Sequence, residues 1–206
     1  MSIEGVRMYN FDDDNFLMDM YIDFLKMAQN VTLNKIDGHE CDHSARVAIL
    51  GIGIGLLEKL NDIDIKMLKL AGIFHDSGRV DDTANALHGV TGASNVMNSI
   101  IDENFKRDIA VMVEYHAIDD NEDELLEIMD KYDIASDKRE HLRLLCSCLK
   151  DADALDRVRF GCSEYCLDKR LLRTKSSFEL ISFAEELYKK SIDFNKKKVL
   201  LELKLN

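Results

Sequence analysis

The stretch Leu68-Lys69-Leu70-Ala71-Gly72-Ile73-Phe74-His75-Asp76-Ser77-Gly78 joins an almost wholly apolar segment to a histidine and an aspartate. This pattern predicts a largely buried helix over residues 62–76, with Gly78 as its expected C-cap. The dyad His75-Asp76 would then lie at the edge of the core. Burial of such polar groups is costly unless a metal ion or a hydrogen-bond network compensates.

Two other apolar stretches also end in polar residues that can bind a metal. His116 follows residues 109–115, and the segment Asp151-Ala152-Asp153-Ala154-Leu155-Asp156 follows residues 142–149. At about 100° per residue, the side chains of Asp151 and Asp153 point roughly 200° apart on a helix, so they cannot both face one metal ion. One of these two aspartates is therefore structural.

The composition favours an all-α protein. The chain has 206 residues, no proline and only ten glycines, and it is long enough for one domain with a full core. We therefore predict a single helical domain over residues 1–206. The expected helices cover residues 12–29, 45–59, 62–76, 88–101, 104–117, 121–132, 138–158 and 177–200.

Charge and targeting signals exclude several classes of function. No apolar run reaches the roughly 18 residues that a membrane span needs, and the first residues lack a signal-peptide pattern, so we expect a cytoplasmic protein without a membrane partner. The five cysteines include no C-x-x-C pair and are expected to be reduced thiols. The formal charge of −12 opposes binding to long nucleic acids but allows a small phosphorylated ligand.

The segment His39-Glu40-Cys41-Asp42-His43 matches the H-E-x-x-H pattern of zinc peptidases. That chemistry needs both histidines on an established helix. Residues 34–38 read as a turn into a helix start, which would place His39 on a fraying first turn. Glu58, the only downstream candidate for a third ligand on that helix, would lie far along the rod from His43. His43 is therefore expected to have another role.

The order of His43, His75-Asp76 and Asp153 resembles the signature of the HD-domain superfamily of metal-dependent phosphohydrolases. The resemblance rests on HSARV, IFHDSGR and LKDADALDRVRFG and covers roughly residues 38–160. It implies a compact helical bundle of the HD-domain type, with helical extensions at both ends. It also favours Asp153 as the metal ligand, with Asp151 as the second choice and Asp156 as a supporting residue.

Two further histidines resemble the extra ligands of family members that hold two metal ions, among them hydrolases of diadenosine polyphosphates and cyclic-dinucleotide phosphodiesterases. They are His88 in LHGVTGA and His116 in VEYHA. A binuclear site would have Asp76 as its bridge, whereas single-metal members lack these middle histidines or use them for the substrate. One or two divalent ions are thus expected, and Fe, Mn, Mg, Zn, Co and Ni are not distinguished. The implied metal ligands are His43, His75, Asp76, His88, His116 and Asp153.

The implied activity is hydrolysis of a small nucleotide or another phosphate ester by a metal-activated water. Asp76 would act both as ligand and as proton acceptor, and Arg79 would stabilise phosphate charge. The alternative is a non-catalytic regulatory domain that binds a metal or a nucleotide. A homo-oligomer is possible, and the region 167–206 could cover the site or form a dimer contact.

Overall fold

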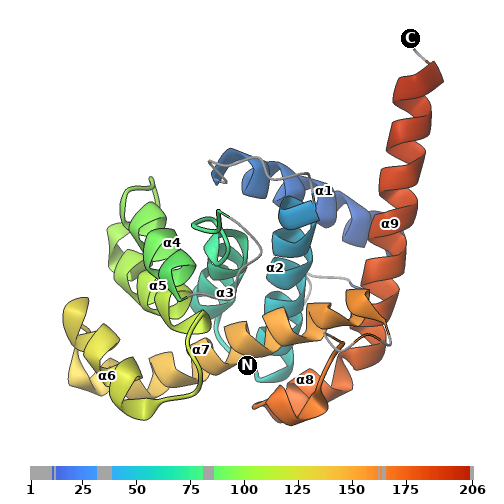
Figure 1. Cartoon of the computed structure of the whole chain (residues 1–206). Helices are drawn as coiled ribbons and strands as arrows, with labels where there is room; N and C mark the ends of the chain where they lie inside the picture. The colour runs from blue at the N-terminus through green and yellow to red at the C-terminus, as the bar shows by residue number, and fades with distance from the viewer. Residues whose placement is uncertain are drawn as a thin grey trace.

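The computed structural model describes residues 11, 13–31, 39–80, 86–161, 163 and 166–204, and the side chains of 39, 40 and 198–204 lie outside the described part. Within these ranges the chain forms helices and turns without a strand, which confirms the predicted all-α class (Figure 1). The α-helices are α1 Asp14–Val31, α2 His39–Leu57, α3 Asp62–Phe74, α4 Leu87–Met97, α5 Glu103–His116, α6 Glu122–Lys131, α7 Arg139–Asp156, α8 Lys175–Glu179 and α9 Ile181–Lys204. Three short 3-10 helices complete the order: η2 Ser136–Lys138, η3 Arg157–Phe160 and η4 Lys169–Leu171.

Helix α2 is the central helix of the bundle. All of its residues from 43 to 55 are buried, and it packs against α1, α3 and α7. A helix covered on several sides needs apolar or small residues around its whole circumference, as the segment Ala45–Leu56 has. His43 and Arg46 are the charged or titratable exceptions within this buried part, and both lie in its early turns.

Three helix starts follow the capping rules, whereas several helix ends were predicted wrongly. Asn61, Asp102 and Asn121 each accept backbone N–H groups with their side chains at the starts of α3, α5 and α6. The helix expected over 88–101 stops at Met97. The one expected over 177–200 is divided into α8 and α9.

Gly78 has a different role from the predicted C-cap. Helix α3 ends at Phe74, and His75 is its C-cap residue. A Cβ atom on Gly78 would lie 2.3 Å from the His88 carbonyl oxygen and 2.5 Å from the backbone nitrogen of Gly92. Gly78 therefore allows the segment after the His-Asp dyad to touch α4.

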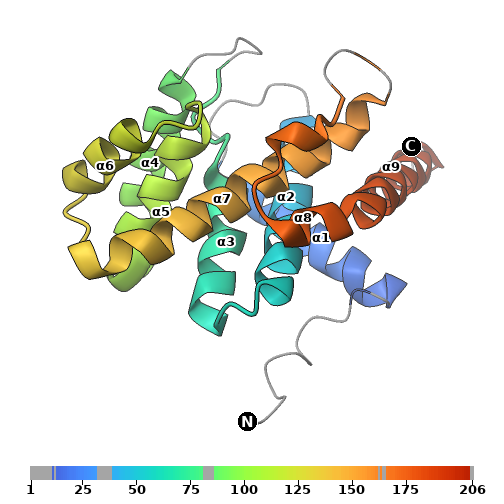
Figure 2. The same cartoon turned by 90° about the horizontal axis from the view of Figure 1, so that it is seen from below.

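Helix α7 runs across α2, α3 and α5 and ties them together (Figure 2). Helix α9 packs on α2 and α7 with its first part and then extends beyond the rest of the bundle (Figure 1). No helix in the described ranges is long and apolar enough to cross a membrane. The single-domain organisation of residues 1–206 stays a prediction.

Candidate metal centre

Five helices place their histidines and aspartates around one point. His75 and Asp76 directly follow α3, His116 is the last residue of α5, and Asp153 lies in the last turn of α7. The other two come from early turns, His43 on α2 and His88 on α4. The structure thus brings together all six residues predicted as ligands.

The first group consists of His43, His75 and Asp153. The Nε2 atom of His43 lies 3.1 Å from Nε2 of His75 and 3.1 Å from Oδ1 of Asp153. The remaining edge, from His75 Nε2 to Asp153 Oδ1, is 3.9 Å. These three atoms are close enough together to hold one metal ion.

Asp76 faces two different pairs of histidines with its two oxygens. Its Oδ2 atom lies 3.7 Å from Nε2 of His43 and 3.5 Å from Nε2 of His75. Its Oδ1 atom lies 3.5 Å from Nε2 of His88 and 3.6 Å from Nε2 of His116. Asp76, His75 and His116 form a second group that could hold an ion, and the position of Asp76 between the pairs suits a bridging ligand.

Packing between α4 and α5 brings the second pair of histidines together. Gly89 faces α5 so closely that a Cβ atom there would lie 2.7 Å from the Glu114 carbonyl oxygen. This contact leaves Nε2 of His88 only 3.2 Å from Nε2 of His116. The glycine after the histidine is therefore part of what positions it.

In each histidine, the hydrogen bond made by Nδ1 determines whether Nε2, which faces the site, carries a hydrogen or a lone pair. His75 Nδ1 donates to the Gly72 carbonyl at 2.8 Å, and His116 Nδ1 donates to a carbonyl three residues earlier at 2.5 Å. His43 Nδ1 donates to the Asp156 carboxylate at 2.7 Å. Since these acceptors have no proton to give, each neutral ring carries its hydrogen on Nδ1 and presents a lone pair at Nε2.

Two nitrogen lone pairs that face one another at such distances repel each other, and a cation between them removes this repulsion. The contact between His43 Nε2 and His75 Nε2 has no hydrogen to share when both rings are neutral and carry their hydrogen on Nδ1. Burial and Arg159 oppose protonation of His43, but hydrogen bonds to Asp153 and Asp156 raise its pKa overall, so a bound metal ion would take the place of a proton on its Nε2 atom. Burial, the largest influence, lowers the pKa of His75 to about 4 although Asp76 opposes the shift, so this ring is neutral near pH 7. Neutral imidazole is the form that binds metals.

The distances between the ligand atoms and the hydrogen bonding of Asp76 also fit a bound metal ion. Metal–ligand bonds of about 2.0–2.2 Å place neighbouring ligand atoms about 3.0–3.5 Å apart, which is close to most of the separations found here. Asp76 Oδ1 is buried and has no hydrogen-bond partner among the described residues. Arg79 Nε lies 3.1 Å away in an ion pair but without a hydrogen bond to this oxygen, and a divalent cation would satisfy it further. The residues present therefore fit a divalent metal ion.

Asp156 supports the centre from behind. It is fully buried and binds Arg46 through two contacts, of 2.6 and 2.9 Å, in addition to its contact with His43. Arg159 adds a third basic contact to Asp156 at 3.0 Å. Burial alone would raise the pKa of Asp156, but Arg46 and His43 outweigh it and lower the pKa to about 2. The carboxylate is thus charged and holds the His43 ring in place.

Asp151, the second choice for the ligand, has another function. Its carboxylate accepts hydrogen bonds from the backbone of Arg173 at 2.9 Å, and from the backbone and hydroxyl of Thr174 at 2.7 and 2.8 Å. It is fully buried in this network and belongs to neither metal group. The structure therefore places Asp153, and not Asp151, at the centre, and Asp151 anchors the segment that precedes α8.

Arg79 lies beside the second group. Its Nε atom is 3.1 Å from Asp76 Oδ1, and its Nη2 atom is 3.4 Å from Nε2 of His88. Its side chain is about a quarter exposed, so part of the guanidinium faces solvent. Arg159 takes the corresponding place beside His43 and was not singled out in the sequence, although its spacing of three residues from Asp156 is a helical contact spacing.

The remaining candidates lie elsewhere or outside the described part. The side chains of His39 and Glu40, which the peptidase pattern requires, lie outside the described residues. His141 contacts Asp64 near the start of α3, at the other end of that helix from the metal centre.

The fold and site define an all-α protein with a buried histidine-aspartate centre that suits divalent metal ions. Comparison with protein families agrees with this class, since the HD domain matches residues 41–158, more than half of the chain. The chain therefore belongs to the HD-domain family. Searches of curated proteins and of solved structures found no match.

Proposed function

We propose that this protein is a metal-dependent phosphohydrolase or phosphodiesterase acting on a small nucleotide or another phosphate ester. One observation carries the proposal: the Nε2 atoms of four histidines converge on the carboxylate of Asp76, with Asp153 beside them. The HD-domain family consists mostly of metal-dependent hydrolases, which supports the reaction class without specifying the substrate.

The proposed ligands divide into two sets that share one residue. His43, His75, Asp76 and Asp153 would hold one divalent ion. Asp76, His88 and His116 would hold a second. A divalent ion here supplies Lewis acidity, which lowers the pKa of a water molecule and offsets negative charge on a phosphoryl oxygen.

Residues of the chain would perform the remaining steps. In the proposal, Asp76 accepts the proton that the attacking water loses, because its carboxylate lies at the centre of the site. Arg79 donates N–H groups to the phosphate oxygens from the partly exposed side of the site. Asp156 keeps His43 oriented, so that its Nε2 atom continues to point into the site.

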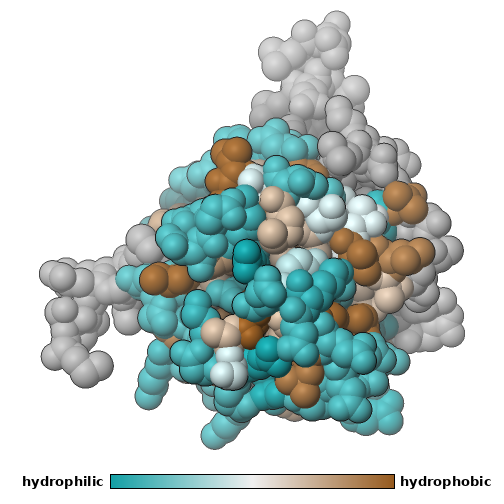
Figure 3. Space-filling model, turned by 90° about the vertical axis from the view of Figure 1, so that its left-hand side faces the viewer, coloured by the Kyte–Doolittle hydropathy of each residue, from teal (hydrophilic) through white to brown (hydrophobic). Residues whose placement is uncertain are grey.

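The charge of the protein limits the proposed substrate. With a formal net charge of −12, the surface repels a long polyanion, whereas a small phosphate ester needs only the local centre and its arginine. The face over α4, α5 and α6 is mainly hydrophilic, with scattered apolar side chains (Figure 3). We therefore propose a small phosphorylated substrate and no long nucleic acid or membrane partner. The cytoplasmic location and the oligomeric state stay predictions.

Turnover after metal reconstitution tests the proposal. The full chain would be stripped with a chelator and reloaded separately with Mn²⁺, Fe²⁺, Co²⁺, Ni²⁺, Zn²⁺ or Mg²⁺. Its metal content would be measured, and hydrolysis of p-nitrophenyl phosphate and bis(p-nitrophenyl) phosphate followed. We expect at least one ion to restore turnover. His75→Ala should reduce it by at least about a hundredfold, since a ligand is lost.

His141→Ala is the matched control. It also removes a histidine that contacts an aspartate, but it lies away from the centre, so metal content and turnover should stay as in the unmodified protein. If ions bind but neither these esters nor a panel of nucleotides is hydrolysed, the regulatory-domain alternative replaces the proposal. If no ion binds to a folded chain, the metal mechanism is refuted.

A further inference from the structure

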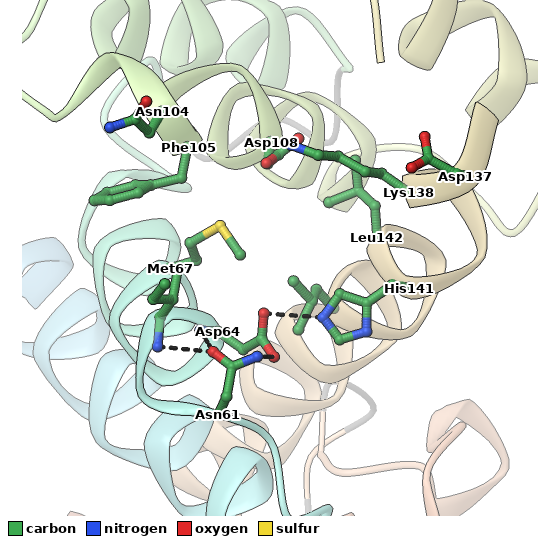
Figure 4. Close-up of a pocket in the computed structure, with 12 residues that line it drawn as sticks. Asn61, Asp64, Met67, Asn104, Phe105, Asp108, Asp137, Lys138, His141 and Leu142 are labelled. Atoms are coloured by element: carbon green, nitrogen blue, oxygen red, sulfur yellow. Dashed lines mark hydrogen bonds and ion pairs between the residues drawn. The ribbon is translucent and has the colours of Figure 1, made fainter. Parts of the chain in front are cut away.

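A cavity lies at the starts of α3, α5 and α7, the opposite ends of these helices from the metal centre. It has a volume of about 380 Å³ and is lined by the early turns of α3, α5 and α7 together with η2 (Figure 4). Along α3, Asp64 in the cavity and His75 at the centre are about 16 Å apart at a rise of about 1.5 Å per residue. The cavity is therefore physically separate from the proposed catalytic site.

The floor of the cavity is apolar. It is formed by Met67 from α3, Phe105 from α5, and Leu142 and Leu145 from α7. All four side chains are largely buried. Figure 4 shows the side chains of Met67, Phe105 and Leu142 around an open centre. A volume of this size with an apolar floor and a few polar groups is typical of sites for small molecules.

One carboxylate in the wall of the cavity already has its partners. Asp64 accepts a hydrogen bond from Nε2 of His141 at 2.9 Å and another from the side chain of Asn61 at 2.6 Å, as the dashed lines in Figure 4 show. These contacts join α3 to α7 and hold the wall in place. Asp64 is therefore already satisfied by groups of the protein.

A second carboxylate, Asp108 on α5, has the Lys138 side chain beside it but forms no direct hydrogen bond or ion pair in the described part of the chain (Figure 4). It lines the cavity and is partly buried. Burial raises the pKa of Asp108, and the nearby charge of Asp64 adds to this, against the opposing effects of Lys138 and His141. A carboxylate partly removed from water gains from a cation that reaches it.

We propose that this cavity binds a small organic cation whose apolar body rests on the floor and whose ammonium group faces Asp108. Three carboxylates line the cavity, from Asp64, Asp108 and Asp137, against the one ammonium of Lys138, so a ligand anion is disfavoured. A bare divalent ion is disfavoured too, because both groups of described residues that could hold a metal lie at the other centre. An amine with an apolar body matches both the charge and the floor.

Titration of the full chain with 2-phenylethylamine, followed by two-dimensional amide NMR, tests the proposal. A ligand with so few atoms should bind with a dissociation constant of about a millimolar, and the shifts should centre on residues that line the cavity. The neutral analogue 2-phenylethanol should bind about tenfold more weakly. Asp108→Asn should also weaken binding of the amine about tenfold. Asp19→Asn, the same change at an exposed position of α1, should not.

Three results would overturn the proposal: shifts that avoid the cavity, equal binding of the amine and the alcohol, or equal binding by the Asp108→Asn and Asp19→Asn variants. The comparison of amine with alcohol uses the unmodified protein, so it decides the matter even if the Asp108 variant fails to fold. Because the readout is binding and requires no turnover, failure here leaves the proposed hydrolase untouched, and failure of the hydrolase leaves this site untouched.

Discussion

Replacing Asp156 by asparagine should destabilise the metal-free protein strongly. Arg46 is only 4% exposed, and two nitrogens of its guanidinium contact the Asp156 carboxylate at 2.6 and 2.9 Å. Removal of one partner of a buried ion pair costs about 3–5 kcal/mol, because the other charge stays buried. The asparagine oxygen still accepts one hydrogen bond, so we expect about 3 kcal/mol, or a melting temperature lower by about 6–12 °C for a chain of this length.

Asp153→Asn, three residues earlier on α7, is the matched change. Asp153 faces His43 Nε2 at 3.1 Å and helps to raise the pKa of His43, so the change is made at a pH above that pKa. The His43 ring is then neutral, donates through Nδ1 and presents a lone pair at Nε2, so no strong bond is lost. The charge removed also repels the nearby carboxylate of Asp76. We therefore expect the metal-free stability to change by no more than about 1 kcal/mol, while metal binding is severely weakened.

Urea unfolding in the presence of a chelator, followed by far-ultraviolet circular dichroism, measures both effects. The reasoning fails if Asp156→Asn unfolds at the same urea concentration as the unmodified protein. It also fails if Asp153→Asn loses as much stability as Asp156→Asn. That second result would mean that the cluster is a hydrogen-bonded structural network, with protons on the inner nitrogens and no requirement for a cation.

Three further outcomes are expected. Gly89→Ala should lower the free energy of unfolding by about 1–3 kcal/mol in thermal denaturation, because its Cβ would lie 2.7 Å from the Glu114 carbonyl oxygen; unchanged stability would contradict this packing. His116→Ala should remove about one ion per chain, by elemental analysis, from protein loaded with two; retention of both would exclude the proposed second set. Burial raises the pKa of Cys146 and Cys148 to about 12, so both thiols stay protonated below that pH and should react with Ellman's reagent only after unfolding, and rapid reaction of the native protein would refute their burial.

Helix positions were predictable from the sequence because they depend on local patterns. The apolar runs before His75 and His116 mark α3 and α5, and the absence of proline removes the usual interruptions. Helix ends were less predictable, since they depend on tertiary contacts. Gly78 illustrates this: its small size serves the approach of α4, which no local rule for C-caps contains.

The order of the histidines and aspartates suggested the metal site, and the structure supplies their meeting point. Spacing on one helix showed that Asp151 and Asp153 cannot face the same ion, but it could not decide which one does. That choice depends on the segment that contains Arg173 and Thr174, which packs against α7. The backbone N–H groups of these two residues donate to the Asp151 carboxylate. A contact between residues more than twenty positions apart leaves no periodic signal in a single sequence.

The network that supports the metal ligands was even less predictable from the sequence. Asp156 joins His43 to Arg46, and Arg46 in turn contacts Ser191 and the ring of Tyr188 on α9. Such a buried arginine is tolerable only where its charge is matched. Asp156 on α7 supplies the opposite charge, and α9 supplies the remaining contacts. Helix α9 therefore belongs to the structure that holds the first ligand in place.

These two halves of the network have opposite effects on stability. The outer half, around Asp156, pairs every charge it buries and so stabilises the fold without a metal. The inner half brings Nε2 of His43 and Nε2 of His75 to 3.1 Å and leaves Asp76 Oδ1 in an ion pair with Arg79 but without a hydrogen bond, which is unfavourable until a cation is present. The outer half fixes the ligands in this unfavourable arrangement before any ion binds, so little reorganisation is needed when an ion binds. Because the ion binds the folded chain, part of the free energy of metal binding adds to the free energy of unfolding. Metal loading should therefore stabilise the chain most where the metal-free protein is least satisfied, between the ends of α3, α5 and α7.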